Sequence, residues 1–370
     1  MKRLRTLALA SLLACGGTPE PAPVTPAPPP PAPAASAAPA KPAAPAETLP
    51  PPKPTTIPLA KTGDEKLDAL LAPADKAFED GDNAKALAGY EAARKAFPKK
   101  AAPIVGAARA RIAKASPTFD FASGDKNPDV AAGVRDLKRA AEMDPSNGPA
   151  QVEFGRALLL AGDAANAEAA LRKGVRLLPE EAEAHSALGV ALLAIGKAEE
   201  AATELTKARD FDPGSAARRG NLGTVLFMRG KVAEAVKEYE VQVRLVPDDA
   251  RAHSDLGTAL LAMNEFGRAV PELRRALELD PKRATFHSNL GYALQLSGKT
   301  TDAIAEYREA IKLDAKLSSA WINLATALAR DPKTRGEARK ALETAQKLDP
   351  SDPRVKANLE ELDALEKSKP

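Results

Sequence analysis

The sequence predicts an all-α protein, an α-solenoid built from stacked pairs of short helices, and three observations lead to this prediction. One pattern of apolar, small and turn residues recurs every 34 residues over residues 148–352. Within each copy the apolar residues lie three to four positions apart, which is the spacing of an amphipathic helix. Glycine or proline separates successive helical runs. Repeat periods of roughly 20 to 50 residues are typical of stacked architectures.

The copy at residues 182–215 illustrates the pattern. Leu188-Gly189 lies in the first helical run, and Gly196 divides this run from the second. Ala201 lies early in the second run, which ends at Pro213 because proline disfavours helical geometry in the residue before it. The leucine–glycine position recurs at steps of 34 residues as Phe154-Gly155, Leu222-Gly223, Leu256-Gly257 and Leu290-Gly291.

One repeat is too small to be stable alone. Each predicted helix has about 14 residues and is therefore about 21 Å long. Helices of this length do not persist alone in water, so they must pack on each other and on the next copy. The glycine after the leucine and the alanine twelve residues later are positions where a larger side chain would push the two helices apart. Such an array needs several copies and a cap.

These spaced residues resemble the tetratricopeptide repeat family. Its 34-residue pattern has a large or aromatic residue at position 4, leucine at 7, a small residue at 8, alanine at 20, leucine or an aromatic residue at 24, alanine at 27 and proline at 32. The resemblance covers about residues 67–352 and implies a right-handed superhelix of about eight repeats. Gly174 and Gln242 depart from it at position 27, and Ala315 departs from it at position 32.

The resemblance divides the folded part of the chain into three regions. Residues 63–147 hold two divergent repeats, residues 148–352 hold six regular ones, and residues 353–370 form a capping helix with Val355 and Leu362 on its apolar face. The regular repeats begin at Gly148, Ala182, Ala216, Ala250, Ala284 and Ser318.

A loop at residues 116–129 replaces the short turn expected inside the second repeat. Long loops inside a compact array are often functional. The alternative is a tolerated surface insertion with Phe119 and Phe121 on the rim of the array.

Residues 1–14 read as a secretory signal, because basic residues precede a short apolar run that is too short to span a bilayer. Leu12-Leu13-Ala14-Cys15 resembles a bacterial lipoprotein cleavage box, which implies that Cys15 is lipidated. Cys15 is the only cysteine, so no internal disulfide competes with this interpretation. The alternative is a plain secretory signal that contains a cysteine. In lipoproteins of this kind an aspartate after the cysteine favours inner-membrane retention, so Gly16 favours the outer membrane.

Residues 15–62 hold about half of the 33 prolines, mixed with alanine, and lack apolar bulk. We expect a disordered, polyproline-like tether. At about 3.1 Å per residue, the part from about Thr18 to Pro58 reaches at most on the order of 120 Å. Removal of the signal deletes three positive charges and brings the formal net charge of +3 to about zero. Nothing electrostatic then indicates a nucleic-acid partner.

No residue pattern indicates catalysis, a metal or a cofactor. His185, His253 and His287 all occupy position 4 of their repeats, so they read as equivalent packing sites that are too far apart to share an ion. Gly298-Lys299-Thr300 resembles the end of a phosphate-binding loop, but Ala293 stands where that loop needs its first glycine, and the context is not strand-to-helix. We therefore expect neither an enzyme nor a small-molecule substrate.

The family binds partner peptides on its concave side, through positions 2, 5, 6, 9, 12 and 13 of each first helix. The resemblance assigns this groove to Val152, Arg156, Val190, Asn221, Thr224, Phe227, Met228, Thr258, Asn289, Tyr292, Gln295 and Asn323. This predicted wall is apolar and amide-rich, and Arg156 alone cannot hold a peptide carboxylate in the way that basic family members do. For Leu193 and Leu261 at position 12, burial under the next repeat is the alternative. Asparagine at position 6 either supports the fold or grips peptide backbone.

An apolar or amphipathic protein segment, anchored around Phe227, Met228 and Tyr292, is therefore the expected partner. The leading hypothesis is a membrane-tethered scaffold or assembly lipoprotein of a Gram-negative envelope that faces the periplasm. It resembles tetratricopeptide lipoproteins that serve type IV pilus, gliding motility or secretion machinery, or that recruit cell-wall enzymes. The alternatives are an accessory subunit or recruiter of wall or glycan enzymes, and a purely structural spacer.

Overall fold

The computed structural model describes residues 50–52, 56–115 and 127–367. The predicted signal, lipidation site and most of the predicted tether lie outside these residues, as do residues 116–126 of the predicted loop at 116–129. The described residues contain 17 α-helices and no strand, which confirms the prediction of an all-α solenoid. The chain divides into two compact units, of which the first ends at Leu245 and the second begins at Val246.

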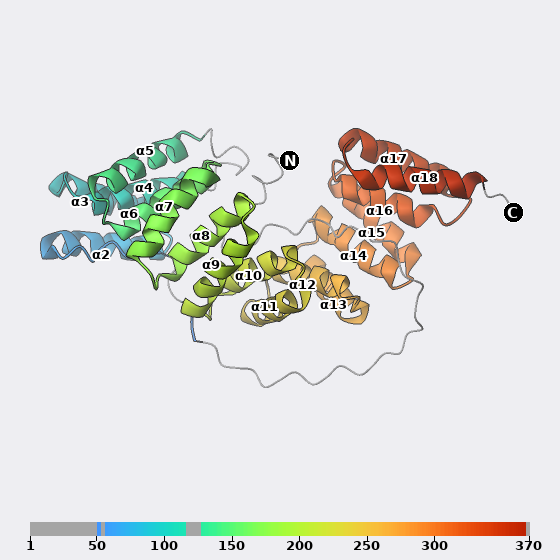
Figure 1. The fold of residues 1–370 in the computed structure, drawn as a ribbon, viewed down its shortest axis with the longest axis horizontal. Helices are drawn as coiled ribbons and strands as arrows, with labels where there is room; N and C mark the ends of the chain where they lie inside the picture. The colour runs from blue at the N-terminus through green and yellow to red at the C-terminus, as the bar shows by residue number, and fades with distance from the viewer. Residues whose placement is uncertain (1–49, 53–55, 116–126, 368–370) are drawn as a thin grey trace. The chain divides into compact units, whose positions relative to one another are not determined.

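The first unit holds five helix pairs (Figure 1). Its helices are α2 Glu65–Glu79, α3 Asn83–Ala96, α4 Ala101–Ala115, α5 Pro128–Met143, α6 Gly148–Leu160, α7 Ala164–Leu177, α8 Ala182–Ala194, α9 Ala198–Phe211, α10 Ala216–Met228 and α11 Val232–Leu245. The chain stays helical through Pro73 in α2.

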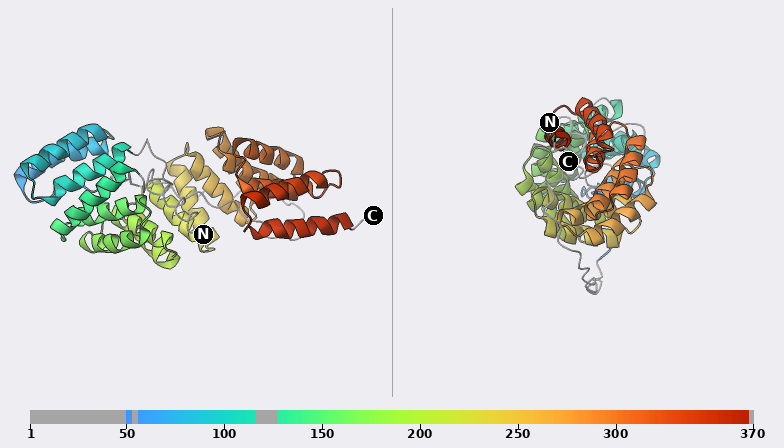
Figure 2. Two further views of the ribbon diagram at one scale, coloured as in Figure 1. Left: turned by 90° about the horizontal axis from the view of Figure 1, so that it is seen from above. Right: turned by 90° about the vertical axis from the view of Figure 1, so that its right-hand side faces the viewer.

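The second unit holds three helix pairs and a last helix. Its helices are α12 Ala250–Ala262, α13 Phe266–Leu279, α14 Ala284–Leu296, α15 Thr300–Leu313, α16 Ser318–Leu328, α17 Arg335–Leu348 and α18 Pro353–Lys367. α13 continues through Pro271. α18 packs on both α16 and α17 and buries Val355 and Leu362. α17 and α18 are the red helices of Figure 2. Among the described residues, none of the helices combines the length and the hydrophobicity that a transmembrane span requires.

Turn residues set where the helices of a pair end and begin. Gly81, Gly162 and Gly196 have φ of 78° to 84° at this turn, a left-handed conformation that glycine adopts without steric cost. Asn264 takes the same position with φ 60°, as asparagine tolerates this region better than most residues. The side chains of Asp82 and Asp163 then accept backbone hydrogen bonds and cap the following helices.

The glycine at position 8 allows the two helices of a pair to approach. A Cβ added at Gly189 would lie 2.5 Å from Cγ of Leu205, which is buried on the partner helix. Gly223 meets Tyr239, and Gly291 meets Tyr307, at similar distances. The repeat pattern in the sequence is thus a pattern of helix contacts.

We expect Gly189→Ala to lower the free energy of unfolding by about 1–2 kcal/mol. Overpacking a core costs about 1–3 kcal/mol, and the better helix propensity of alanine offsets up to about 1 kcal/mol of this. Gly336→Ala is the matched control, because Gly336 lies in a helix and a Cβ there meets no atom within 4 Å. Urea unfolding followed by circular dichroism measures both variants. Equal stability of the two would contradict the packing role of Gly189.

Candidate protein-binding surface

The first helices of successive repeats pack on one another and form one layer in each unit. In the first unit this layer is made by α2, α4, α6, α8 and α10, and in the second by α12, α14, α16 and α18. We call it the first-helix layer. All twelve residues predicted for the groove lie on it, seven in the first unit and five in the second.

Most of the predicted groove side chains are buried in the structure. These buried residues are Val152, Val190, Asn221, Thr224, Thr258, Asn289, Tyr292 and Asn323. Arg156, Phe227 and Gln295 are half-buried. Met228 is the most accessible, with 62% of its surface exposed. Of the two position-12 leucines for which burial was the alternative, Leu261 is buried and Leu193 is half-buried.

Several of these polar side chains link neighbouring elements. Nδ2 of Asn289 donates to Oγ1 of Thr258 at 3.4 Å, from α14 to α12. The equivalent contact joins Asn358 to Thr326 at 3.2 Å, from α18 to α16. In these two cases asparagine at position 6 supports repeat stacking. Thr224 similarly contacts the hydroxyl of Tyr239 at 3.1 Å.

The first-helix layer of the first unit carries a row of ion pairs that the sequence analysis missed. Arg156 lies 3.3 Å from Glu153 and 3.4 Å from Glu183, and Arg218 pairs with Glu183 at 3.2 Å. Arg218 also donates to Asp212 at 2.9 Å, and both are buried. The wall is therefore not simply apolar and amide-rich, and Arg156 is already paired with two carboxylates.

A second group of buried charges lies at the start of this layer. Arg109 Nη2 lies 2.6 Å from Oδ1 of Asp75 and 2.5 Å from the hydroxyl of Tyr90, whose O–H donates to the same carboxylate oxygen at 2.6 Å. Glu153 lies 3.9 Å from Arg109 and connects this group to the row of ion pairs. Asp75 and Arg109 stand 34 residues apart, both at position 9. That coincidence of opposite charges at one groove position was the signal available in the sequence.

A segment of the predicted tether packs against Asp75 and Arg109. Oδ2 of Asp75 accepts hydrogen bonds from the backbone N–H groups of Leu59, at 2.7 Å, and Ala60, at 2.9 Å. Arg109 Nη1 donates to the carbonyl oxygen of Ile57 at 2.7 Å. The side chains of Ile57 and Leu59 are 4% and 3% exposed. Residues 57–60, which the sequence analysis assigns to the tether, therefore pack on the first helices of the array.

The three histidines have matching contacts. Nδ1 of His185, His253 and His287 lies 2.5 to 2.7 Å from a glutamate on the second helix of the same repeat. Each Nε2 lies 2.9 to 3.1 Å from the carbonyl oxygen of the proline six residues earlier. The part of the chain that the structure describes contains no cluster of three or more His, Cys, Asp or Glu side chains that could hold a metal ion.

Sequence comparison identifies the repeat. One model of the tetratricopeptide repeat matches residues 152–216, 254–318 and 297–353, and a second matches residues 192–259. Together these matches extend over residues 152–353, more than half of the 370 residues. A comparison with curated protein sequences finds no significant match.

Solved structures share the fold. The chain is similar to one in the APC/C hetero-tetramer Cut9–Hcn1, with 18% identity and a TM-score of 0.59, over 82% of this chain and 57% of that one. It is also similar to PilF of Pseudomonas aeruginosa, with 21% identity and a TM-score of 0.50, over 59% of this chain and 98% of that one. A third similar structure is YrrB, a TPR protein with an unusual peptide-binding site, with 21% identity and a TM-score of 0.41, over 51% of this chain and 97% of that one.

The Cut9–Hcn1 alignment covers little more than half of that chain, and identities this low establish the fold alone. The family is established by the repeat matches over residues 152–353, by the helix pairs and by the spacing of glycine, alanine and proline within each pair. The chain belongs to the tetratricopeptide repeat family.

Proposed function

We propose that this protein is a lipid-anchored scaffold of a bacterial envelope that holds partner proteins on its first-helix layer. The tetratricopeptide repeat fold supports protein–protein interaction, and proteins of this family are generally non-catalytic scaffolds. The envelope location is supported by the sequence alone, through the signal-like residues 1–14 and the cleavage-box pattern that ends at Cys15. Type IV pilus, gliding motility and secretion machinery remain the proposed systems.

One observation carries the interaction proposal. Met228 and Phe227 end α10, on the first-helix layer, and Met228 is 62% exposed, the most of any large apolar side chain that the structure describes. Methionine and aromatic side chains are enriched at protein interfaces, and methionine adapts its shape to different partners. Neighbouring charges on this layer are paired, so they offer no strong binding site for a free carboxylate. An apolar or amphipathic helix or strand of a partner is the expected ligand.

We expect the double variant Phe227→Asp/Met228→Asp to lose partner capture. The aspartates bring two charges into the patch that an apolar segment would cover, and truncating a binding hot spot costs about 2 kcal/mol or more. A pull-down from envelope extract, quantified by mass spectrometry, measures the loss. Leu313→Asp is the control, since Leu313 is 37% exposed but lies on the second helix α15.

Unchanged capture by the double variant, at unchanged helicity, would remove this patch from the proposal. Equal loss of capture by the control variant would show that any added charge disrupts binding. That result would also remove the Phe227–Met228 patch from the proposal. We replace Met228 rather than Tyr292, because Tyr292 is only 9% exposed and its substitution would disturb packing.

We expect Cys15→Ser to release the protein from membranes. A multiply acylated cysteine anchors stably, and serine cannot form the thioether that carries the lipid. Membrane fractionation of cells that express the full chain measures the change. Inhibition of lipoprotein processing by globomycin is the parallel control. Equal membrane recovery of the variant would show that acyl chains do not hold the protein.

A further inference from the structure

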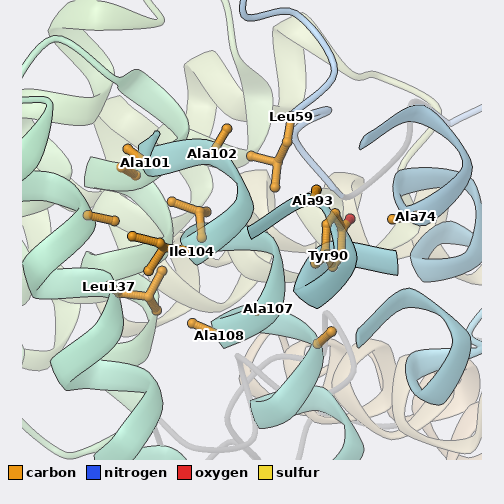
Figure 3. Packing of buried hydrophobic residues seen from close by; sticks show 14 of the residues in the cluster. Leu59, Ala74, Tyr90, Ala93, Ala101, Ala102, Ile104, Ala107, Ala108 and Leu137 are labelled. Atoms are coloured by element: carbon orange, nitrogen blue, oxygen red, sulfur yellow. The ribbon is translucent and has the colours of Figure 1, made fainter. Parts of the chain in front are cut away.

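We propose that Asp75, Tyr90 and Arg109 form a peptide clamp that residues 57–60 of the same chain fill, and that an apolar–proline–apolar segment of a partner protein binds by displacing them. We call these three side chains the clamp. The proposal rests on the proposed scaffold function and adds a second site to it, with a stated ligand chemistry. Figure 3 shows Leu59 in one cluster of buried residues with Tyr90 and Ala93 of α3 and Ala102 of α4.

One half of the clamp is fixed by the fold. Oδ1 of Asp75 accepts both the Tyr90 hydroxyl and Arg109 Nη2, so α2, α3 and α4 each contribute one side chain. Burial raises the pKa of Tyr90 well above its usual range, so the phenol remains an O–H donor at any physiological pH. The guanidinium of Arg109 also lies 4.6 Å from the ring centre of Phe78. This cation–π contact helps to fix the orientation of the guanidinium.

The other half of the clamp faces the peptide backbone. Oδ2 of Asp75 accepts the N–H groups of Leu59 and Ala60, and Arg109 Nη1 donates to the carbonyl of Ile57. All three bonds are charge-assisted, and all three go to main-chain atoms. The clamp therefore recognises the main chain in one direction, at a bend centred on Leu59, and makes no hydrogen bond to a ligand side chain. The residue between the two apolar positions needs no N–H, which suits Pro58.

Selectivity comes from the flanking apolar side chains. Ile57 and Leu59 are almost completely buried, whereas Pro58 between them is half-buried. A cavity of about 440 Å³ opens beside this segment and is lined in part by Lys100, Pro149 and Leu178. This cavity has room for a partner segment that continues past the clamp, or for a side chain larger than Ile57 or Leu59.

Residues 57–60, which we call the cis segment, contact the clamp as a bound peptide ligand would. The cis segment lies on position-9 side chains of the first-helix layer, the layer on which the family resemblance places the groove, and contributes no helix of its own. A segment joined to its site by a short linker has an effective concentration in the millimolar range, so a partner must outcompete it or bind after it leaves. Because of this competition, a partner segment binds the clamp only when residues 57–60 have left it.

The test uses the full chain and a fluorescein-labelled peptide, Thr-Ile-Pro-Leu-Ala-Lys-Thr, which copies residues 56–62. In the double variant Ile57→Ser/Leu59→Ser the cis segment no longer fills the apolar sites. Fluorescence anisotropy should show that this variant binds the peptide about tenfold or more tightly than the unchanged chain. Two control peptides should not bind: one with serine at both apolar positions, and one with N-methyl-leucine, which lacks the N–H that Asp75 accepts.

A second measurement serves if the double variant does not fold. In the unchanged chain, excess unlabelled peptide should speed hydrogen exchange at the amides of Leu59 and Ala60. A folded double variant that fails to bind the peptide, or that binds the serine peptide equally well, would make residues 57–60 a structural cap and overturn the proposal. Unchanged exchange at both amides would do the same. Self-association of the double variant in place of peptide binding, seen by sedimentation, would assign the clamp to a second copy and also overturn it.

These outcomes are separate from the pull-down on Phe227 and Met228. Failure of the clamp would leave partner capture by that patch unchanged, whereas failure of the scaffold proposal would show as no partner captured by the unchanged chain. The two sites use different helices of the first unit, so neither set of substitutions touches the other site.

Discussion

Replacing Arg109 by methionine is expected to destabilise the first repeats by about 3–5 kcal/mol, because it leaves Asp75 buried without its cation. The side chains of Arg109 and Asp75 are 3% and 9% exposed. Methionine preserves the apolar stem of arginine but donates no hydrogen bond to Asp75, to the Tyr90 hydroxyl or to the Ile57 carbonyl. The loss should appear as faster hydrogen exchange in α2, α3 and α4, since repeat arrays open locally.

Arg308→Met is the matched control for Arg109→Met. Arg308 pairs with Glu337 at 2.8 Å, but both side chains are about half exposed. Exposed pairs contribute about 0–1 kcal/mol, so this substitution should have little effect on urea unfolding. If Arg109→Met lowers the free energy of unfolding no more than Arg308→Met does, the buried group around Asp75 does not stabilise the array.

The repeat positions could be predicted from the sequence because each depends on one local contact. Gly189 and Leu205 face each other at fixed positions of the 34-residue pattern, and the same contact recurs at Gly223 with Tyr239. Helix ends follow from turn residues such as Gly196 for the same reason. A contact that repeats with the period of the chain is visible in the sequence, since each copy repeats the same residue types.

The packing of residues 57–60 on the clamp could not be predicted in this way. Ile57 and Leu59 lie in a proline-rich stretch whose overall composition indicates a tether. Overall composition does not show that these two apolar residues are buried. The contact between Ile57 and Arg109 joins residues 52 apart in the sequence and occurs once, so no period signals it. The ion pairs around Arg156 were missed because the sequence shows charges but not which of them meet. Burial of Tyr292 likewise depends on packing that a list of groove positions omits.

His287 is expected to make the stability of the second unit depend on pH. Both of its ring nitrogens face acceptors, the Glu306 carboxylate at 2.7 Å and the Pro281 carbonyl at 3.1 Å, so only the doubly protonated ring can donate to both. The hydrogen bond to Glu306 raises the pKa of His287 above its usual value of 6.5, and burial opposes this rise only in part. The folded state therefore holds the proton more tightly than the unfolded chain does.

The direction of the effect follows from linkage. A group whose pKa is raised on folding stabilises the folded state fully below its unfolded pKa, and this contribution disappears as the pH rises through the folded pKa. His287→Ala should then lower the free energy of unfolding by about 1.5–3 kcal/mol at acidic pH, the usual worth of hydrogen bonds to a charged group, and by less at alkaline pH.

Urea unfolding of the unchanged chain and of His287→Ala, each across neutral pH, measures the difference between the two at every pH. Taking this difference cancels the pH dependence that the rest of the chain contributes to the free energy of unfolding. NMR titration of the His287 ring gives the midpoint directly. A difference that stays constant with pH would contradict the charged-ring assignment, whereas one that grows as the pH rises would reverse its sign. Because the imidazole joins α14 to the glutamate on α15 and to the turn before α14, its proton stabilises both the helix pair and the contact with the preceding turn.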